Sequence, residues 1–447
     1  MVNYLDLTNA EHQPIMIAPL FRKYYNYFNS IIIHQEHVGT LSFFQILGCI
    51  AQTKGIKLKM KSEDYDLRTS MIWFSPSGTG KGLTINLIHE FLDRIGIKNK
   101  NIKNQVTSQA LVGSFDDSTH ERNMLKGYSP ENPKWRNPKI TGIMEENLYV
   151  SFDEVQWMFE TTKGDDCLTI LRMVADNYGT KSNLISSDTL KAIVQQGLEY
   201  HSPVTFLTSS YFVPKVKSII TQNGIFQRVA THFSNLTQEQ LDEIIEFNNL
   251  YDEKERKGLD RRKGEIIELL KQKLNSPITE IRYNSKEVAK FFNEHYKQYL
   301  SSLRDKHSIS QEELKDYFVR GRNMVLKYAG LNAFLHDRSE ITEEDIILGV
   351  QIVYTNLDTI YQYILTNAIN EKEEAIIKII RLIINPNKWY SKTELRDELC
   401  KSRRWQDGRF GGKVKTSKLL NDISDYFIIE KNRNNPNELL HKLKYIK

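Results

Sequence analysis

The stretch SPSGTGKGL, from Ser75 to Leu83, has the residue types that most directly indicate chemistry. Glycines at positions 78 and 80 let the backbone bend so that successive N–H groups converge on one anion, and Lys81 adds a positive charge. Loops of this kind hold nucleotide phosphates at the N-terminus of the following helix. We therefore expect ATP to bind at Ser75, Pro76, Ser77, Gly78, Thr79, Gly80, Lys81, Gly82 and Leu83.

The same stretch departs from the usual phosphate-binding pattern at two positions. Ser75 stands where a glycine is usual, and Gly82 stands where a hydroxyl residue normally contacts Mg²⁺. Thr84 is a nearby hydroxyl that could compensate for Gly82. Taken alone, the loop could also be an ordinary glycine turn between a strand and a helix.

Two adjacent carboxylates follow the apolar run Leu148–Phe152. If this run is a buried parallel strand, Asp153 and Glu154 lie at its carboxyl end, which faces the ligand crevice in α/β proteins. Asp153 can then hold Mg²⁺, directly or through water. Glu154 is placed to polarise an attacking water as general base. The alternative is a strand that leads into an acidic helix cap.

A second polar strand end and one arginine complete the candidate site. The run Pro203–Ser210 ends in two serines, and we expect Ser209, with Thr208 as second choice, to contact the γ-phosphate or the attacking water. Arg228 stands among apolar residues soon afterwards. It could stabilise transition-state charge at a neighbouring subunit's nucleotide, as arginine fingers do. The alternative is a structural arginine at a helix end.

Apolar periodicity predicts the elements that position these residues. Met71–Phe74 reads as a buried strand and Leu83–Ile95 as the helix after the loop. Residues 1–60 read as helical, with helices expected over Ala18–Phe28 and Leu41–Thr53.

The stretch Tyr178–His201 could form a hairpin before the strand that ends at Ser210. Lys181 and Lys191 would then lie near its tip. We expect these two lysines to bind DNA, although they could equally be ordinary exposed lysines.

Two stretches between residues 236 and 370 read as helical. The first, residues 236–275, is dense in charge of both signs and is typical of a solvated helix or linker. Residues 284–370 read as a helical bundle. Within it, Arg320 is expected to begin a helix, where a basic first turn opposes the helix dipole. That placement indicates an anion nearby, or else only a surface charge pair.

The C-terminal region is strongly basic. Residues 375–447 hold 17 Lys and Arg against 8 Asp and Glu, a balance of +9 that leaves −4 for the preceding residues. Helices are expected over Ala375–Ile384, after a Ser391 cap and over Lys413–Tyr426, and a hairpin is expected around Asn432–Asn437. This order is typical of a winged helix.

The winged helix would bind duplex DNA or, alternatively, dock on a protein. Arg409 and Trp405 add basic and aromatic surface. The expected DNA contacts are Arg403, Arg404, Lys413, Lys415 and Lys418.

Composition narrows the class of protein. The 447 residues are 40% hydrophobic and 26% charged, and no apolar run is long enough to span a membrane. The three cysteines are far apart and in no metal-ligand spacing, which argues against a zinc site. With no N-terminal signal region visible, we expect a cytoplasmic protein without a membrane partner.

The order of phosphate loop, acidic strand end, polar strand end and arginine resembles that of AAA+ ATPases. More narrowly, the C-terminal half resembles minichromosome-maintenance-type helicases and the related superfamily III replicative helicases of phages, plasmids and mobile islands. Arg320 followed by Lys327–Ala329 is similar to their sensor-2 helix, and Ser339–Asp345 to the turn that opens their next helix. Val106–Gly113 is similar to the segment after the phosphate loop in phage helicases. The resemblance covers roughly residues 65–447.

This resemblance implies a fold with four parts. They are a helical N-terminal region (1–60), an α/β AAA+ P-loop core (61–235), a helical linker and lid (236–370) and a C-terminal winged helix (371–447).

The resemblance also implies a function: an ATP-dependent replicative DNA helicase that works as a ring, in the family a hexamer. Single-stranded DNA would pass through the channel, and duplex DNA would meet the winged helix. ATP and Mg²⁺ would bind between subunits, with Arg228 and Arg320 supplied by the neighbour. The alternative is an ATP-switched, origin-binding replication initiator without unwinding activity of its own.

Overall fold

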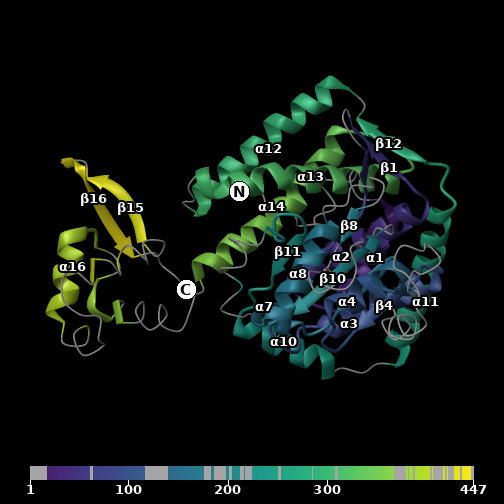
Figure 1. Ribbon diagram of the computed structural model, residues 1–447, viewed down its shortest axis with the longest axis horizontal. Coiled ribbons are helices and arrows are strands. Elements are labelled where there is room, and N and C mark those ends of the chain that lie inside the picture. Colours follow the sequence, from purple (N-terminus) through teal and green to yellow (C-terminus); the bar gives the residue numbers. More distant parts are fainter. Residues whose placement is uncertain are drawn as a thin grey trace, which may run out of the picture.

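The computed structural model describes most of the chain, in ranges separated by gaps. The described residues are 18–60, 64–115, 139–175, 183–185, 198–200, 204–211, 216, 224–249, 253–283, 285–307, 311–366, 379–380, 382–385, 388–402, 405, 416–417, 420, 427–432 and 435–443. They form a main α/β body and a smaller C-terminal unit, each with its own hydrophobic core (Figure 1).

The main body is built on a five-stranded parallel sheet with the strand order β11-β3-β10-β7-β4. Its strands are β3 (Met71–Phe74), β4 (Asn99–Ile102), β7 (Tyr149–Phe152), β10 (Thr205–Ser210) and β11 (Ala230–Phe233). Strands β3, β7, β10 and β11 are buried along their whole length, as expected for parallel strands covered on both faces. The continuous apolar runs that predicted β3, β7 and β10 are thereby confirmed as strands.

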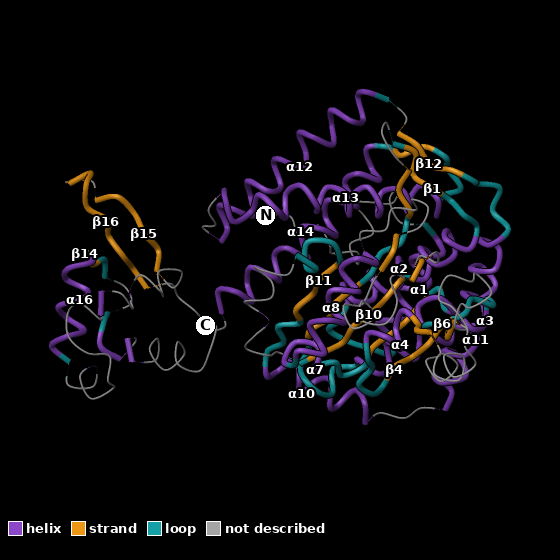
Figure 2. Tube along the Cα trace, viewed as in Figure 1, coloured by secondary structure: helices purple, strands orange, loops and turns teal. Residues whose placement is uncertain are grey.

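Helices surround this sheet (Figure 2). The two N-terminal helices are α1 (Pro19–Asn29) and α2 (Glu36–Thr53), and α3 (Lys81–Arg94) follows β3, so the three helices predicted here are confirmed. Helix α2 is buried from Val38 to Ala51, because it packs between other helices and the sheet. The Gln45 amide donates to the Phe206 carbonyl of β10 at 3.0 Å, which fixes the helix to the sheet.

Short elements connect the strands of the main body. They are α4 (Ser108–Val112), β5 (Gly113–Phe115), β6 (Lys139–Thr141), α6 (Ile143–Glu146), α7 (Gln156–Glu160), α8 (Thr162–Ala175), β8 (Asn183–Ile185) and β9 (Leu198–Tyr200). Strands β8 and β9 pair antiparallel, which confirms the hairpin predicted within residues 178–201.

A second sheet joins the N-terminal part of the chain to the region after the central sheet. Its strands lie in the order β13-β12-β1-β2. They are β1 (Lys57–Lys59), β2 (Asp64–Asp66), β12 (Glu280–Tyr283) and β13 (Glu340–Ile341). Strand β1 pairs in parallel with β12, so that Lys57 lies opposite Glu280. No pattern in the sequence predicted this sheet.

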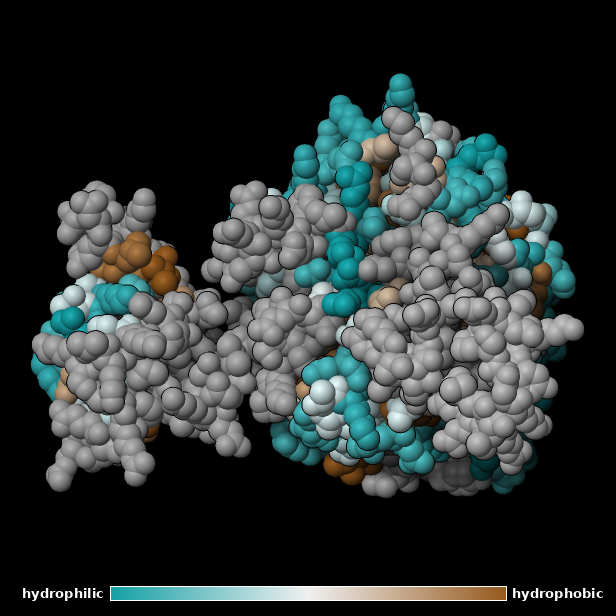
Figure 3. Space-filling model, viewed as in Figure 1, coloured by the Kyte–Doolittle hydropathy of each residue, from teal (hydrophilic) through white to brown (hydrophobic). Residues whose placement is uncertain are grey.

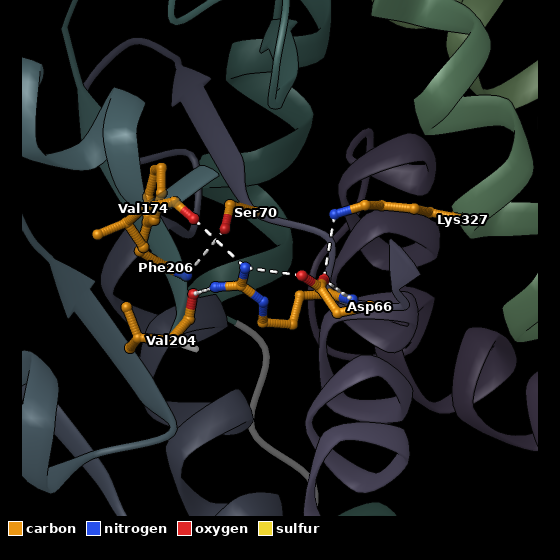
Figure 4. Close-up of polar contacts among 7 residues, drawn as sticks. Asp66, Ser70, Val174, Val204, Phe206 and Lys327 are labelled. Carbon is orange, nitrogen blue, oxygen red and sulfur yellow. Dashed lines mark hydrogen bonds and ion pairs between the residues drawn. The ribbon is translucent and has the colours of Figure 1, made fainter. Parts of the chain in front are cut away.

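A buried ion cluster, formed by Asp66, Arg68 and Lys327, links the helical bundle to the sheets (Figure 4). The Arg68 guanidinium donates to Asp66 Oδ2 at 2.8 Å and to the carbonyls of Val204 and Val174 at 2.8 and 3.3 Å. Lys327 Nζ lies 3.2 Å from Asp66 Oδ1. Burial by itself would raise the pKa of Asp66, but the two cations more than offset this and hold it well below its ordinary value.

Long helices make up the region after the central sheet. They are α10 (Gln238–Asn249), α11 (Glu253–Leu274), α12 (Lys286–His307), α13 (Gln311–Leu335) and α14 (Glu343–Thr366). Helix α14 begins at the predicted turn, where Asp345 Oδ2 accepts from the Thr342 amide at 2.8 Å.

The predicted start of the arginine-bearing helix is wrong. Helix α13 begins at Gln311, so Arg320 lies well inside it and the argument from the helix dipole does not apply. Residues 311–315 (QEELK) are good helix formers that extend the helix upstream. Gly321 lies inside this helix. A Cβ at this position would lie 2.5 Å from the Tyr296 hydroxyl of α12. The glycine therefore serves close packing of α12 and α13.

The C-terminal unit contains β14 (Tyr390–Ser391), α16 (Lys392–Lys401), β15 (Phe427–Asn432) and β16 (Asn435–Leu443). The predicted Ser391 cap is confirmed: Ser391 Oγ accepts from the Glu394 amide, and the Glu394 carboxylate accepts from the Ser391 amide. Strands β15 and β16 pair antiparallel, which confirms the hairpin. Ile429 and Leu439 are exposed on these strands. Figure 3 shows a hydrophobic (brown) area on this unit.

The described chain is therefore a mixed α/β protein with a parallel sheet. Among its described helices, none combines the length and apolar composition that crossing a membrane requires.

Candidate functional site

The carboxyl ends of β3, β10 and β7 meet at one edge of the central sheet and carry the predicted polar residues. Strand β10 lies between the other two. The register of the three strands brings Asp153 level with Ser209, and Tyr211 level with Ser75, the first residue of the loop. Residues far apart in the sequence are thus neighbours at this edge.

The loop between β3 and α3 is shaped by its glycines. Gly78 and Gly80 have φ angles of +78° and +90°, in the left-handed region that glycine adopts readily. Ser75 Oγ and Thr79 Oγ1 are 2.6 Å apart and bridge the base of the loop. A Cβ on Gly78 would meet nothing within 4 Å, so the tip of the loop faces open space. Successive backbone N–H groups at such a turn form a cradle that suits a phosphate.

The Lys81 side chain lies along its own loop. Its ammonium donates to the carbonyls of Ser75 and Pro76 at 2.8 and 2.7 Å. It also lies 4.2 Å from the ring centroid of Tyr211. These contacts hold the ammonium between its own loop and the ring of Tyr211.

The electrostatic environment of Lys81 is unusual for a lysine. Burial lowers its pKa to about 8, against the opposing influence of the Glu154 and Asp153 carboxylates. The residue is only 6% exposed. The Lys81 ammonium is therefore poorly solvated when no anion is bound.

Asp153 presents its two carboxylate oxygens to different neighbours. Ser209 Oγ donates to Oδ1 at 3.0 Å, and a Cβ built on Gly82 would lie 3.8 Å from Oδ2. Among the described residues there is no cluster of three or more metal-ligating side chains. One carboxylate beside a serine fits Mg²⁺, which binds largely through water and substrate phosphates, and Asp153 is the residue that would hold it.

Tyr211 is a part of this site that the sequence analysis missed. Its hydroxyl donates to Glu154 Oε1 at 2.9 Å. Glu154 itself has a φ of +54°, a left-handed conformation that is uncommon for a residue with a side chain. Strain of this kind clusters at functional sites. No local pattern marks Tyr211, because its proximity to Glu154 follows from the strand register.

Two further hydroxyls considered as candidates lie buried. Thr84 Oγ1 and Thr208 Oγ1 have no hydrogen-bond partner among the described residues. Ser209, in contrast, is bonded to Asp153. Because side chains alternate along a strand, Thr208 faces the opposite side of β10 from Ser209. The geometry therefore favours Ser209 of the two strand candidates.

Arg228 lies in the segment between β10 and β11. It precedes β11, whose first residue, Ala230, pairs with Met71 at the start of β3, while the loop follows the end of β3. Arg228 itself lies in the turn before β11, where the nearby Phe226 ring packs 6.1 Å from the Phe74 ring. The Arg228 guanidinium donates to the carbonyl of Gly224 at 2.7 Å. Arg320 is half-buried within α13.

The basic residues predicted to contact DNA lie outside the described residues, as does Arg409. The predicted contacts are Lys181, Lys191, Arg403, Arg404, Lys413, Lys415 and Lys418.

A second polar cluster lies on α3, β4 and β7. His89 Nε2 is 2.6 Å from Ser151 Oγ, and His89 Nδ1 contacts Asn99 Oδ1. The arrangement has the connectivity of a nucleophile and base, but Ser151 is fully buried within β7. Because no substrate could reach Ser151, this cluster serves to fasten α3 to the sheet.

No protein-family model matches the chain, and no curated protein matches it.

Proposed function

We propose that the chain is an ATPase of the AAA+ type, with a P-loop core, a helical lid and a C-terminal winged helix, and that it drives DNA unwinding as a ring. One observation carries the ATPase proposal. The glycine loop with Lys81, the Asp153–Glu154 pair and Ser209 converge at one sheet edge, on three adjacent strands. A glycine turn or an acidic helix cap alone would not require this convergence.

Each residue has a role that follows from its position. Backbone N–H groups of the loop and the Lys81 ammonium hold the phosphates. Asp153 would hold Mg²⁺, which would supply positive charge to offset the negative charge of the phosphates. Glu154 accepts a proton from the attacking water or orients it, and Ser209 fixes the Asp153 carboxylate.

The proposal that the protein works as a ring depends on the role of Arg228. Arg228 follows the polar strand end, where an arginine can reach a nucleotide held by a second copy and stabilise transition-state charge there. A shared site of this kind requires an oligomer, and the resemblance to replicative helicases favours a hexamer.

The DNA proposal rests on the C-terminal unit and its charge. The unit has its own core, a capped helix and an antiparallel hairpin, within a stretch of net charge +9. A basic unit of this kind binds the phosphate backbone in a salt-dependent manner. Single-stranded DNA would pass through the ring.

The decisive experiment is strand displacement on a forked DNA substrate, with and without ATP. We expect displacement only with ATP, and none by Glu154→Gln, which should still bind ATP. ATP turnover without displacement on forks of either polarity would contradict the helicase proposal.

The separate core of the C-terminal unit favours one alternative, an ATP-switched initiator that binds an origin sequence. An initiator should bind one duplex site much more tightly than random duplex at matched salt, and should not displace strands. Deletion of residues 375–447 should weaken duplex binding more than basal ATPase activity under either proposal. Unchanged affinity would instead indicate a protein-docking unit.

The ring itself is tested by mixing two inactive variants. Arg228→Ala should lose about 10³-fold or more in turnover, and Lys81→Ala should be inactive for a different reason. In a mixture, some interfaces pair an intact Lys81 with an intact Arg228, so activity should partly return and depend on protein concentration. Absence of recovery in mixtures that co-assemble would show that Arg228 acts within its own subunit or only supports packing.

A further inference from the structure

Tyr211 occupies a position from which one side chain reaches both charged groups of the candidate site. It follows directly after β10, at the level of the first loop residue. It lies two residues after Ser209 and so continues the face of the strand that carries the Asp153 contact. The residue is half-buried, which leaves its ring against the site and its hydroxyl accessible to Glu154.

The two ends of the Tyr211 side chain make different contacts. The hydroxyl donates to Glu154 Oε1 at 2.9 Å, which leaves Oε2 of that carboxylate available to water. The ring face lies 4.2 Å from Lys81 Nζ, a distance at which a cation is attracted by the ring quadrupole. The ammonium also donates to two loop carbonyls, so the loop and the ring together determine its position.

We propose that Tyr211 is the positioning residue of this site, whose hydroxyl orients Glu154 and whose ring keeps Lys81 at the mouth of the loop. The inference rests on the proposed ATPase function. Glu154 and Lys81 each need a neighbouring side chain that fixes their orientation. Glu154 is exposed and has a left-handed backbone, so its carboxylate would otherwise sample several directions. Lys81 has a long side chain with many rotamers, and a contact that orders it before nucleotide binds lowers the entropy lost on binding.

The two contacts predict separable kinetic effects. Removal of the hydroxyl alone should disorder Glu154 and lower kcat, while ATP binding stays unchanged. Removal of the ring as well should also weaken ATP binding. A tyrosine that only fills space would not separate the two, because Tyr211→Phe keeps almost the whole side chain.

The test compares Tyr211→Phe and Tyr211→Leu with the wild type, in the full chain, by steady-state turnover and by equilibrium binding of ATP. We expect Tyr211→Phe to lower kcat by about tenfold with ATP affinity unchanged, since one hydrogen bond to a charged group is lost. Tyr211→Leu should show the same loss of kcat and about threefold weaker ATP binding. Tyr354→Phe, a hydroxyl deletion on α14 outside the site, is the matched control and should match the wild type.

A double variant tests whether Tyr211 acts through Glu154. In single-turnover measurements, Tyr211→Phe combined with Glu154→Gln should be no slower than Glu154→Gln alone, because the hydroxyl no longer has a carboxylate to orient. Additive losses would overturn the inference, as would a Tyr211→Phe enzyme with unchanged kcat. If the wild type binds no ATP, the proposed function fails and this inference fails with it. Normal wild-type turnover with an indifferent Tyr211→Phe defeats the inference alone.

Discussion

Two groups of charged residues in the main body differ in how completely their charges are satisfied. In the buried ion cluster, Asp66 lies between two cations, and the Arg68 guanidinium also donates to two main-chain carbonyls. At the loop edge, Lys81 is turned back onto its own loop and Glu154 has a strained backbone. The first arrangement is closed to ligands, whereas the second gains partners when an anion binds. The ion pairs of the buried cluster therefore serve the fold, whereas the hydrogen bonds of Lys81 to neutral carbonyls can be exchanged for contacts with an anion.

The strongest test of this contrast is Lys81→Ala. Since it deletes a phosphate contact at the candidate site, we expect ATP turnover to fall by about 10²- to 10³-fold. The melting temperature should stay within about 2 °C of the wild type, because the ammonium contacts only loop carbonyls and the face of the Tyr211 ring and forms no buried ion pair of the kind found at Asp66. Normal turnover in the folded variant would show that this loop is not the active site.

Asp66→Asn should lower stability and leave ATP binding unchanged, which is the opposite of the result expected for Lys81→Ala. Loss of the carboxylate leaves Arg68 and Lys327 buried without their counter-charge, which costs about 3–5 kcal/mol of the free energy of unfolding. Denaturant unfolding measures this loss. Asp66→Asn protein that remains folded should bind ATP as tightly as the wild type. Weaker ATP binding would show that the buried ion cluster also contributes to the candidate site. Asp64→Asn on the same strand is the control, since its partner Lys59 is exposed, and it should leave stability unchanged.

The low pKa of Lys81 predicts a pH dependence of nucleotide affinity. Only the protonated ammonium attracts phosphate, and burial lowers its pKa in the nucleotide-free protein to about 8. Affinity should therefore be constant below pH 8 and fall as the pH rises through this value, by up to tenfold per pH unit. Titration of ATP binding between pH 6.5 and 9.5 measures the profile, and Lys81→Arg, which stays charged, should flatten it. A flat wild-type profile would contradict the expected deprotonation.

The smallest expected effect is tighter ATP binding, and it is expected for a substitution at Gly82. Gly82 lacks the hydroxyl usual at that position, and a Cβ there would lie in ordinary contact with Asp153 Oδ2. Gly82→Ser should therefore place a second oxygen beside the proposed Mg²⁺ position and tighten Mg²⁺-dependent ATP binding by about threefold to tenfold. Gly82→Ala adds the Cβ without the oxygen and should not tighten it. Equal Mg²⁺-dependent ATP affinities of the two variants would show that a hydroxyl at position 82 does not contribute to binding.

The sequence predicted those parts of the fold and site that depend on local pattern. Continuous apolar runs identified β3, β7 and β10, and a serine with a glutamate three residues later identified the α16 cap. The placement of Asp153 beside Ser209 followed from the rule that parallel strands end at the same edge.

The parts that the sequence did not predict depend on tertiary context. The sheet of β1, β2, β12 and β13 consists of strands of two to four residues, too short to show a period. The predicted start of α13 is wrong because the basic residues Arg320 and Arg322 suggested that the helix begins there, whereas it extends upstream to Gln311. The contact of Tyr211 with Glu154 arises only once β10 lies beside β7.

The pairing of β1 with β12 has a consequence for how the chain is made. During synthesis, Lys57 leaves the ribosome long before Glu280, its partner across the sheet. At about 5–20 residues per second the delay is roughly 10–45 s, during which one edge of β1 has no strand beside it. An open edge invites pairing with other nascent chains. Fragments that stop before Glu280 would keep this edge permanently, so an expression fragment of the α/β core should extend through β12.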